Sequence, residues 1–117
     1  MTILIAEDNE KMRTMLKDIV SKYFSEIYEC SDGEEACELY KQNKPDWTLM
    51  DIEMPVMDGI AATKKITQSN PDAKVIIVTS YDSKVLRENA KEAGAIQYIL
   101  KENSNEILDL LKQFSIN

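Results

Sequence analysis

Apolar residues follow two alternating patterns along this chain of 117 residues. Five short runs are apolar almost throughout and rich in β-branched residues, which predicts buried strands. These strands are expected at Thr2–Ala6, 27–30, 46–50, 74–78 and 96–100. After the strands, apolar residues recur three or four positions apart, which is typical of a helix with one buried face. The chain is therefore predicted to consist of five strand–helix units.

The helices are predicted from their inner faces and from residues that begin or end helices. Two faces are clear: Met12, Met15, Leu16, Ile19, Val20 and Phe24 in the first helix, and Ile107, Leu110, Leu111 and Phe114 in the last. Capping boxes are predicted at Asp32 with Glu35 and at Asn103 with Glu106. The other boundaries follow from turn residues: a second helix ending at 43–45, a third over 59–69, and a fourth, with Leu86, Ala90 and Ala93 inside, ending at Gly94.

The order of these elements predicts the fold class. Strands that alternate with helices and are apolar along their length are typical of a parallel sheet covered on both faces. Because crossovers between parallel strands are right-handed, the expected architecture is an α/β, doubly wound sheet. No linker, repeat or low-complexity tract interrupts the pattern, and the length suits one domain, so residues 1–117 are expected to form a single domain.

Composition and charge exclude several classes of protein. The formal net charge is −7, and nucleic acid requires a basic face, so this domain is not expected to bind nucleic acid directly. With two cysteines and no histidine a zinc site is not expected, and Cys30 and Cys37 are predicted to be buried thiols in a reducing compartment. No apolar run approaches the ~20 residues of a membrane span, and no signal peptide is recognisable. We expect a cytoplasmic protein without membrane contact.

Polar side chains follow four of the five predicted strands. Glu7-Asp8 follow the first strand, Asp51 the third, Thr79-Ser80 the fourth and Lys101 the fifth. The carboxyl ends of parallel strands share one edge of the sheet, where open α/β sheets bind their ligands, so these side chains are expected to be neighbours. Each acid alone is better explained as the cap of the next helix. Capping does not explain the whole set.

The predicted cluster has the parts of a phosphoryl acceptor. Three acids in one crevice repel each other, and a divalent cation relieves this repulsion; oxygen ligands without cysteine or histidine favour Mg²⁺. Asp51 is a nucleophile able to form an acyl phosphate, and Lys101 is expected to pair with it. The cation, the lysine and the hydroxyls of Thr79 and Ser80 would stabilise charge on the transferring oxygens.

These residues resemble the receiver domain of two-component response regulators over essentially the whole chain. The matching positions are Glu7-Asp8, Met50-Asp51-Ile52-Glu53-Met54-Pro55, Asp58-Gly59, Thr79-Ser80, Tyr98 and Lys101. Each match alone is weak, but their order on five strand–helix units is specific. The resemblance implies a flavodoxin-like sheet of five parallel strands in the order 2-1-3-4-5.

The resemblance also implies a role for each matching residue. Asp51 would accept a phosphoryl group from a sensor histidine kinase, and Mg²⁺ would be bound by Asp8, Asp51, the backbone carbonyl of Glu53, and Glu7 through water. Lys101 would bind a phosphoryl oxygen, and Thr79 and Tyr98 would move as a switch, with Ser80 beside them. The switch would remodel the face of helix four, strand five and helix five, to which an output protein or a C-terminal effector domain responds. The domain would catalyse only its own phosphorylation and dephosphorylation.

One departure from the family pattern leaves alternatives open. A proline with a cis peptide bond commonly follows the strand-five lysine, but Glu102 stands here, and a non-proline cis bond costs about 2.5–4 kcal/mol. Residues 98–103 instead resemble a subgroup that usually carries a C-terminal helix-turn-helix, although the ending without an obvious linker favours a stand-alone chain. The alternatives are a docking module independent of phosphorylation and a Mg²⁺-dependent phosphohydrolase.

Overall fold

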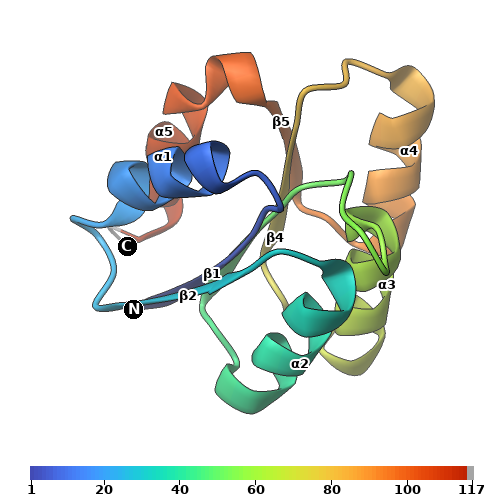
Figure 1. The fold of residues 1–117 in the computed structure, drawn as a ribbon, viewed down its shortest axis with the longest axis horizontal. Helices are drawn as coiled ribbons and strands as arrows, with labels where there is room; N and C mark the ends of the chain where they lie inside the picture. The colour runs from blue at the N-terminus through green and yellow to red at the C-terminus, as the bar shows by residue number, and fades with distance from the viewer. Residues whose placement is uncertain (116–117) are drawn as a thin grey trace.

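A computed structural model describes residues 1–115 of the chain and contains one sheet of five parallel strands. The strands are β1 (Thr2–Ala6), β2 (Glu26–Cys30), β3 (Trp47–Met50), β4 (Val75–Thr79) and β5 (Gln97–Leu100). The helices are α1 (Glu10–Val20), α2 (Gly33–Asn43), α3 (Gly59–Ser69), α4 (Lys84–Ala93) and α5 (Asn105–Ser115). The strand order is β2-β1-β3-β4-β5, so the predicted fold class and topology are confirmed (Figure 1).

The helices cover the sheet on both sides and bury two separate cores. Helices α1 and α5 lie on one face, and α2, α3 and α4 on the other (Figure 1). On the first face Leu16 of α1 and Ile107 of α5 pack against Ile3 and Leu49. On the second face Ala36 of α2, Ala62 of α3 and Ala90 of α4 pack against the sheet. Burial from both sides explains why β1, β3 and β4 are apolar at nearly every position, whereas the edge strands β2 and β5 are partly exposed and carry polar residues such as Glu29 and Gln97.

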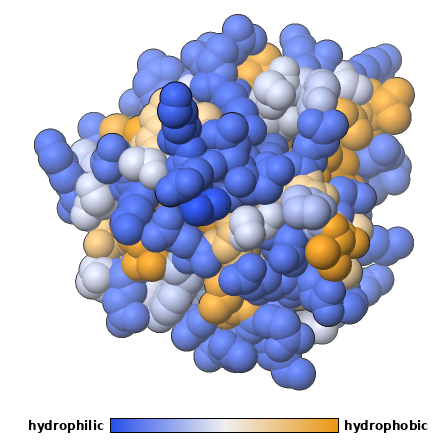
Figure 2. Space-filling model, viewed as in Figure 1, coloured by the Kyte–Doolittle hydropathy of each residue, from blue (hydrophilic) through white to orange (hydrophobic). Residues whose placement is uncertain are grey.

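Some large apolar side chains remain exposed outside these cores, among them Val56, Val85 and Ile96. On the face drawn in Figure 2 the surface is mostly hydrophilic, and the apolar side chains form small separate groups. Cys30 is buried and Cys37 half-buried, and both are free thiols. Burial raises the pKa of Cys30 to about 12, so its thiol stays protonated and unreactive. No helix among residues 1–115 is long and apolar enough to cross a bilayer.

The predicted boundaries are wrong mainly at two helices. Phe24 is buried but lies in the turn after α1, because that helix ends at Val20, and Met15 is 39% exposed rather than internal. Asn103 does not cap the last helix: residues Lys101–Asn103 form a short 3-10 turn, and α5 begins at Asn105. The predicted packing of the Phe114 side chain lies outside the described part of the chain.

The helix starts show that polar side chains other than the expected cluster do the capping. Asn9, Asp32, Asp58 and Ser83 accept hydrogen bonds from the first turns of α1, α2, α3 and α4. At the predicted capping box the Glu35 N–H donates to Asp32 Oδ1 at 2.8 Å. The acids Asp8 and Asp51 are therefore free of the capping role that was their simplest explanation.

The strand register brings distant polar residues to one edge of the sheet. Ala6 lies opposite Met50, so the next residues, Glu7 and Asp51, leave the sheet side by side. Thr79 lies opposite Leu100, which places Lys101 at the same edge. No peptide bond is cis among the described residues, so the bond between Lys101 and Glu102 is trans.

Candidate functional site

A cleft of about 460 Å³ lies at the carboxyl edge of the sheet. Its walls come from the loops that follow β1, β3, β4 and β5. The lining residues are Glu7, Asp8, Asn9, Asp51, Glu53, Met54, Pro55, Ser80, Tyr81 and Lys101. Most of the residues singled out from the sequence line this cleft, but Thr79 and Tyr98 do not.

Three carboxylates converge in the cleft. Glu7, Asp8 and Asp51 each offer an oxygen within 4.8 Å of the other two. Glu7 is fully buried and Asp51 is 5% exposed, whereas Asp8 stands in solvent. These hard oxygen donors, with no sulfur or imidazole among them, suit a divalent cation such as Mg²⁺.

Lys101 lies between the two buried acids. Its Nζ is 2.7 Å from Glu7 Oε1 and 3.5 Å from Asp51 Oδ1. The expected pairing with Asp51 is present, but the shorter contact is with Glu7. Burial would lower the pKa of Lys101, but its contacts with the two carboxylates outweigh burial and raise it. The lysine is therefore charged at neutral pH despite its enclosure.

The two buried acids differ in how readily they ionise. Burial, and then the neighbouring Glu7, raise the pKa of Asp51 to about 7, and Lys101 only partly opposes this. Burial also acts to raise the pKa of Glu7, but Lys101 and the Asn9 N–H hold it below its usual value. Partial desolvation at the cleft and the Glu7 carboxylate raise the pKa of Asp8. In the metal-free protein the pair of Glu7 and Asp51 thus holds a proton near neutral pH, mainly on Asp51.

The loop after β3 folds back over Asp51. The Asp51 N–H donates to Ala6 O at 2.9 Å, and the Gly59 N–H donates to Ile52 O at 2.9 Å. A Cβ on Gly59 would stand 1.8 Å from the Asp51 carbonyl oxygen, so only glycine permits this approach. The Asp58-Gly59 pair of the sequence motif therefore starts α3 and packs it against the carbonyl of Asp51.

The loop after β4 forms another wall. Ser80 and Tyr81 line the cleft, but Thr79 is fully buried, and its Oγ1 accepts a hydrogen bond of 3.3 Å from the Tyr81 N–H. Tyr98 lies farther away in β5. Its hydroxyl donates to Tyr81 O at 2.7 Å, and the Arg87 guanidinium stacks 4.6 Å from its ring centre. Thr79 and Tyr98 thus meet at the main chain of Tyr81.

Two further residues line the cleft beside those of the family pattern, and one of them, Asn9, was given no role by the sequence pattern. Asn9 caps α1 and stands beside the acids; an Asn directly before a helical apolar pattern is a recognisable cap signal. Tyr81 faces Glu53, and the hydrogen bond between their side chains raises the pKa of the phenol. No sequence spacing indicates this second contact, because it joins two loops.

Comparison with known proteins agrees with this geometry. Residues 3–112 match the family model described as response regulator receiver domain. Over 100 residues the chain is 43% identical to the chemotaxis protein CheY of Thermotoga maritima, covering 85% of this chain and 83% of that protein. It is 39% identical over 100 residues to the transcriptional regulatory protein PdtaR of Mycobacterium tuberculosis, where the match covers 85% of this chain and 48% of the relative.

A solved structure matches nearly the whole fold. It is the crystal structure of a CheX–CheY complex with BeF₃ and Mg²⁺ from Borrelia burgdorferi. The TM-score is 0.88 at 29% identity, and the match covers 96% of this chain and 87% of that one.

Proposed function

The chain belongs to the response regulator receiver domain family of two-component signalling, and we propose that Asp51 is its phosphoacceptor. The observation that carries this assignment is the position of Asp51. Asp51 lines the cleft and stays 5% exposed at 3.5 Å from Lys101, with two further acids beside it, whereas Glu7 is fully enclosed and paired with Lys101 at 2.7 Å. The donor would be a phosphohistidine of a sensor histidine kinase.

The proposed transfer is a single displacement at phosphorus. An Asp51 carboxylate oxygen attacks the phosphoryl group and forms a P–O bond. The P–N bond to the donor histidine breaks, and its electron pair leaves on the imidazole nitrogen, which takes up a proton. Only ionised Asp51 can attack, and the positive charge of Lys101, 3.5 Å away, favours this ionised form. After transfer the same charge would stabilise the negative phosphoryl oxygens. The domain would catalyse only this step and its own dephosphorylation, in which water attacks phosphorus, the bond from phosphorus to the Asp51 oxygen breaks, and inorganic phosphate leaves.

The acidic cluster fits Mg²⁺, and we assign the cation to Asp8, Asp51, the backbone carbonyl of Glu53, and Glu7 through water. The chemistry of the donors supports this, because all of them are hard oxygens from one cleft. When bound, the cation neutralises charge on the acids and on the phosphoryl oxygens. The contact of 2.7 Å between Lys101 and Glu7 holds the end of β5 against the end of β1 and so keeps the base of the cleft in place.

The switch is proposed to run from the cleft to β5 through the loop after β4. Thr79 and Ser80 would contact the phosphoryl group, and a shift of this loop would move the Tyr81 carbonyl to which Tyr98 is bonded. Tyr98 would then change the face of α4, β5 and α5. The partner at this face would be an output protein or a C-terminal effector domain, with residues 1–117 as one receiver domain acting in the cytoplasm.

The missing proline does not displace Lys101. With a trans bond to Glu102, its ammonium still contacts both buried acids. The missing proline was the main argument for a docking module independent of phosphorylation, and the contacts of Lys101 weaken that argument.

The assignment of Asp51 is tested with a small acyl phosphate such as acetyl phosphate. In the presence of Mg²⁺ the protein should gain the mass of one phosphoryl group, and a chelator should prevent this. Asp51→Asn should gain none, whereas the control Asp82→Asn, which changes an exposed acid outside the cleft, should be labelled like the natural chain. Labelling of Asp51→Asn at the natural rate would show that the acceptor is another residue.

A further inference from the structure

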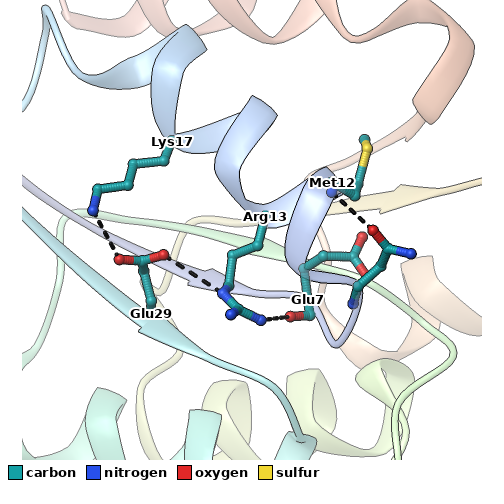
Figure 3. Close-up of polar contacts among 6 residues, drawn as sticks. Glu7, Met12, Arg13, Lys17 and Glu29 are labelled. Atoms are coloured by element: carbon teal, nitrogen blue, oxygen red, sulfur yellow. Dashed lines mark hydrogen bonds and ion pairs between the residues drawn. The ribbon is translucent and has the colours of Figure 1, made fainter.

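The loop between β1 and α1 carries two of the three acids, and Glu7 is held at both of its backbone groups. The Glu7 N–H donates to Cys30 O of β2 at 3.0 Å. The Glu7 carbonyl accepts a hydrogen bond of 2.8 Å from Nη1 of Arg13, about one turn into α1 (Figure 3). The second contact matters for Asp8, because the carbonyl of Glu7 and the N–H of Asp8 belong to one rigid peptide plane.

Arg13 is itself held in place on its other side. Its Nε lies 3.5 Å from Glu29 Oε1 of β2, and Lys17 Nζ lies 3.1 Å from Glu29 Oε2 (Figure 3). The Arg13 side chain is only 22% exposed. Figure 3 shows the guanidinium between the two partners, with the Glu29 carboxylate on one side and the Glu7 carbonyl on the other. A planar guanidinium presents separate N–H groups in fixed directions and can serve both partners at once.

An ordinary surface ion pair would explain the contact with Glu29 but not the contact with Glu7. Exposed pairs of this kind contribute about 0–1 kcal/mol and have no effect on a distant site. Lys17 is such a residue, since it binds the same Glu29 and is 47% exposed. Arg13 differs from Lys17 in one respect that concerns the cleft: its hydrogen bond to the Glu7 carbonyl.

We propose that Arg13 is a positioning residue for the divalent cation site. By holding the Glu7 carbonyl it fixes the peptide plane between Glu7 and Asp8, and with it the direction in which the Asp8 carboxylate enters the cleft. Asp8 needs such support because its side chain is exposed and its backbone lies in a loop. This inference rests on the proposed cation site, but it concerns a residue that touches neither the cation nor the phosphoryl group.

The test compares Arg13→Met with the matched control Lys17→Met, both as ¹⁵N-labelled protein without any phosphodonor. Before metal is added, Arg13→Met should shift the Asp8 amide resonance, whereas Lys17→Met should leave it in place. Mg²⁺ titration followed at the Asp8 and Asn9 amides should then show weaker binding for Arg13→Met by roughly 10-fold or more. Loss of a hydrogen bond that orients a metal ligand typically costs about 10–100-fold in affinity. Lys17→Met should bind Mg²⁺ like the natural chain.

Two further variants separate the carbonyl contact from the ion pair. Glu29→Gln removes the charge partner but keeps the hydrogen bond to Glu7, so its Mg²⁺ affinity should stay near that of the natural chain. Arg13→Lys keeps the positive charge but lacks the planar guanidinium that contacts both partners, so it should recover only part of the Mg²⁺ affinity. The same variant replaces Arg13→Met in the test if Arg13→Met does not fold. Natural affinity in a folded Arg13→Met or Arg13→Lys would overturn the positioning role and leave the proposed function standing. If the natural chain itself binds no Mg²⁺, the cation site and the role of Arg13 fail together.

Discussion

Among single residues, Asp51 combines two properties that conflict. It is buried beside a second acid, which disfavours its charge, yet the proposed reaction needs that charge. Glu7 is buried more deeply but is paired at 2.7 Å with Lys101. Because the closer acid takes the lysine, Asp51 is left with the raised pKa. A bound cation would remove the conflict, which gives a physical reason for the metal dependence of the proposed reaction.

The raised pKa of Asp51 predicts a dependence of stability on pH in the metal-free protein. The unfolded carboxyl loses its proton near pH ~4, whereas the folded one keeps it until about pH 7, so stability falls as pH rises through this window. The amide in Asp51→Asn does not titrate, so the stability of this variant relative to the natural chain should increase as the pH rises through the same window. Urea unfolding in a chelator measures this difference. If the stability of Asp51→Asn relative to the natural chain fell as the pH rose, the assigned shift in the pKa of Asp51 would be contradicted.

Among the elements, the loop between β3 and α3 contains the clearest strain. Val56 has a φ of 69°, which a β-branched residue rarely adopts, and its side chain is 77% exposed. The Met57 N–H donates to Pro55 O at 2.8 Å across Val56, and the Met57 carbonyl accepts from the Gly33 N–H at 3.0 Å. The contact with α2 therefore holds the tight turn closed.

We expect Val56→Gly to stabilise the fold. Removing a strained positive φ gains about 1–3 kcal/mol, and the greater freedom of glycine in the unfolded chain costs about 0.5–1 kcal/mol. The net gain in free energy of unfolding should be about 1 kcal/mol by urea denaturation. Val85→Gly is the matched control: Val85 is also exposed, at 66%, but lies in α4, where glycine should lower stability. A loss at both positions would mean that the turn at Val56 carries no strain.

The elements also show where sequence patterns are reliable. Among residues 1–115, apolar patterns together with turn and capping residues identified all five strands and all five of the longer helices, and the pattern is strongest in β1, β3 and β4, which are buried on two faces. The pattern was wrong near residue 103, where a 3-10 turn delays α5 until Asn105. That turn has no apolar period of its own, and Asn103 with Glu106 reproduces a capping signal that the chain does not use.

For the whole molecule, folding and cation binding should be coupled. The acids at the cleft come from separate loops, since Glu7 follows β1 and Asp51 follows β3, so the site exists only in the folded state. A ligand that binds only the folded state at ~100 times its Kd stabilises by ~2.7 kcal/mol.

Mg²⁺ at this concentration should therefore raise the Tm by roughly 10 °C, since ~1 kcal/mol shifts a domain of somewhat more than 100 residues by about 4 °C. Thermal unfolding followed by circular dichroism measures the shift, with NaCl at equal ionic strength as the control. An equal rise in NaCl would mean screening of the net charge of −7 rather than a specific site.

The sequence by itself determined the elements, the fold class and the edge of the sheet at which the candidate residues meet. These follow from local periodicity and from the rule that parallel strands share one carboxyl edge. Only the tertiary structure decided how those residues divide their contacts. It placed Lys101 closer to Glu7 than to Asp51, buried Thr79 behind the cleft, and brought Arg13 to the Glu7 carbonyl. Such contacts join segments whose separation depends on strand register and loop conformation, and residue spacing along the chain contains no measure of either.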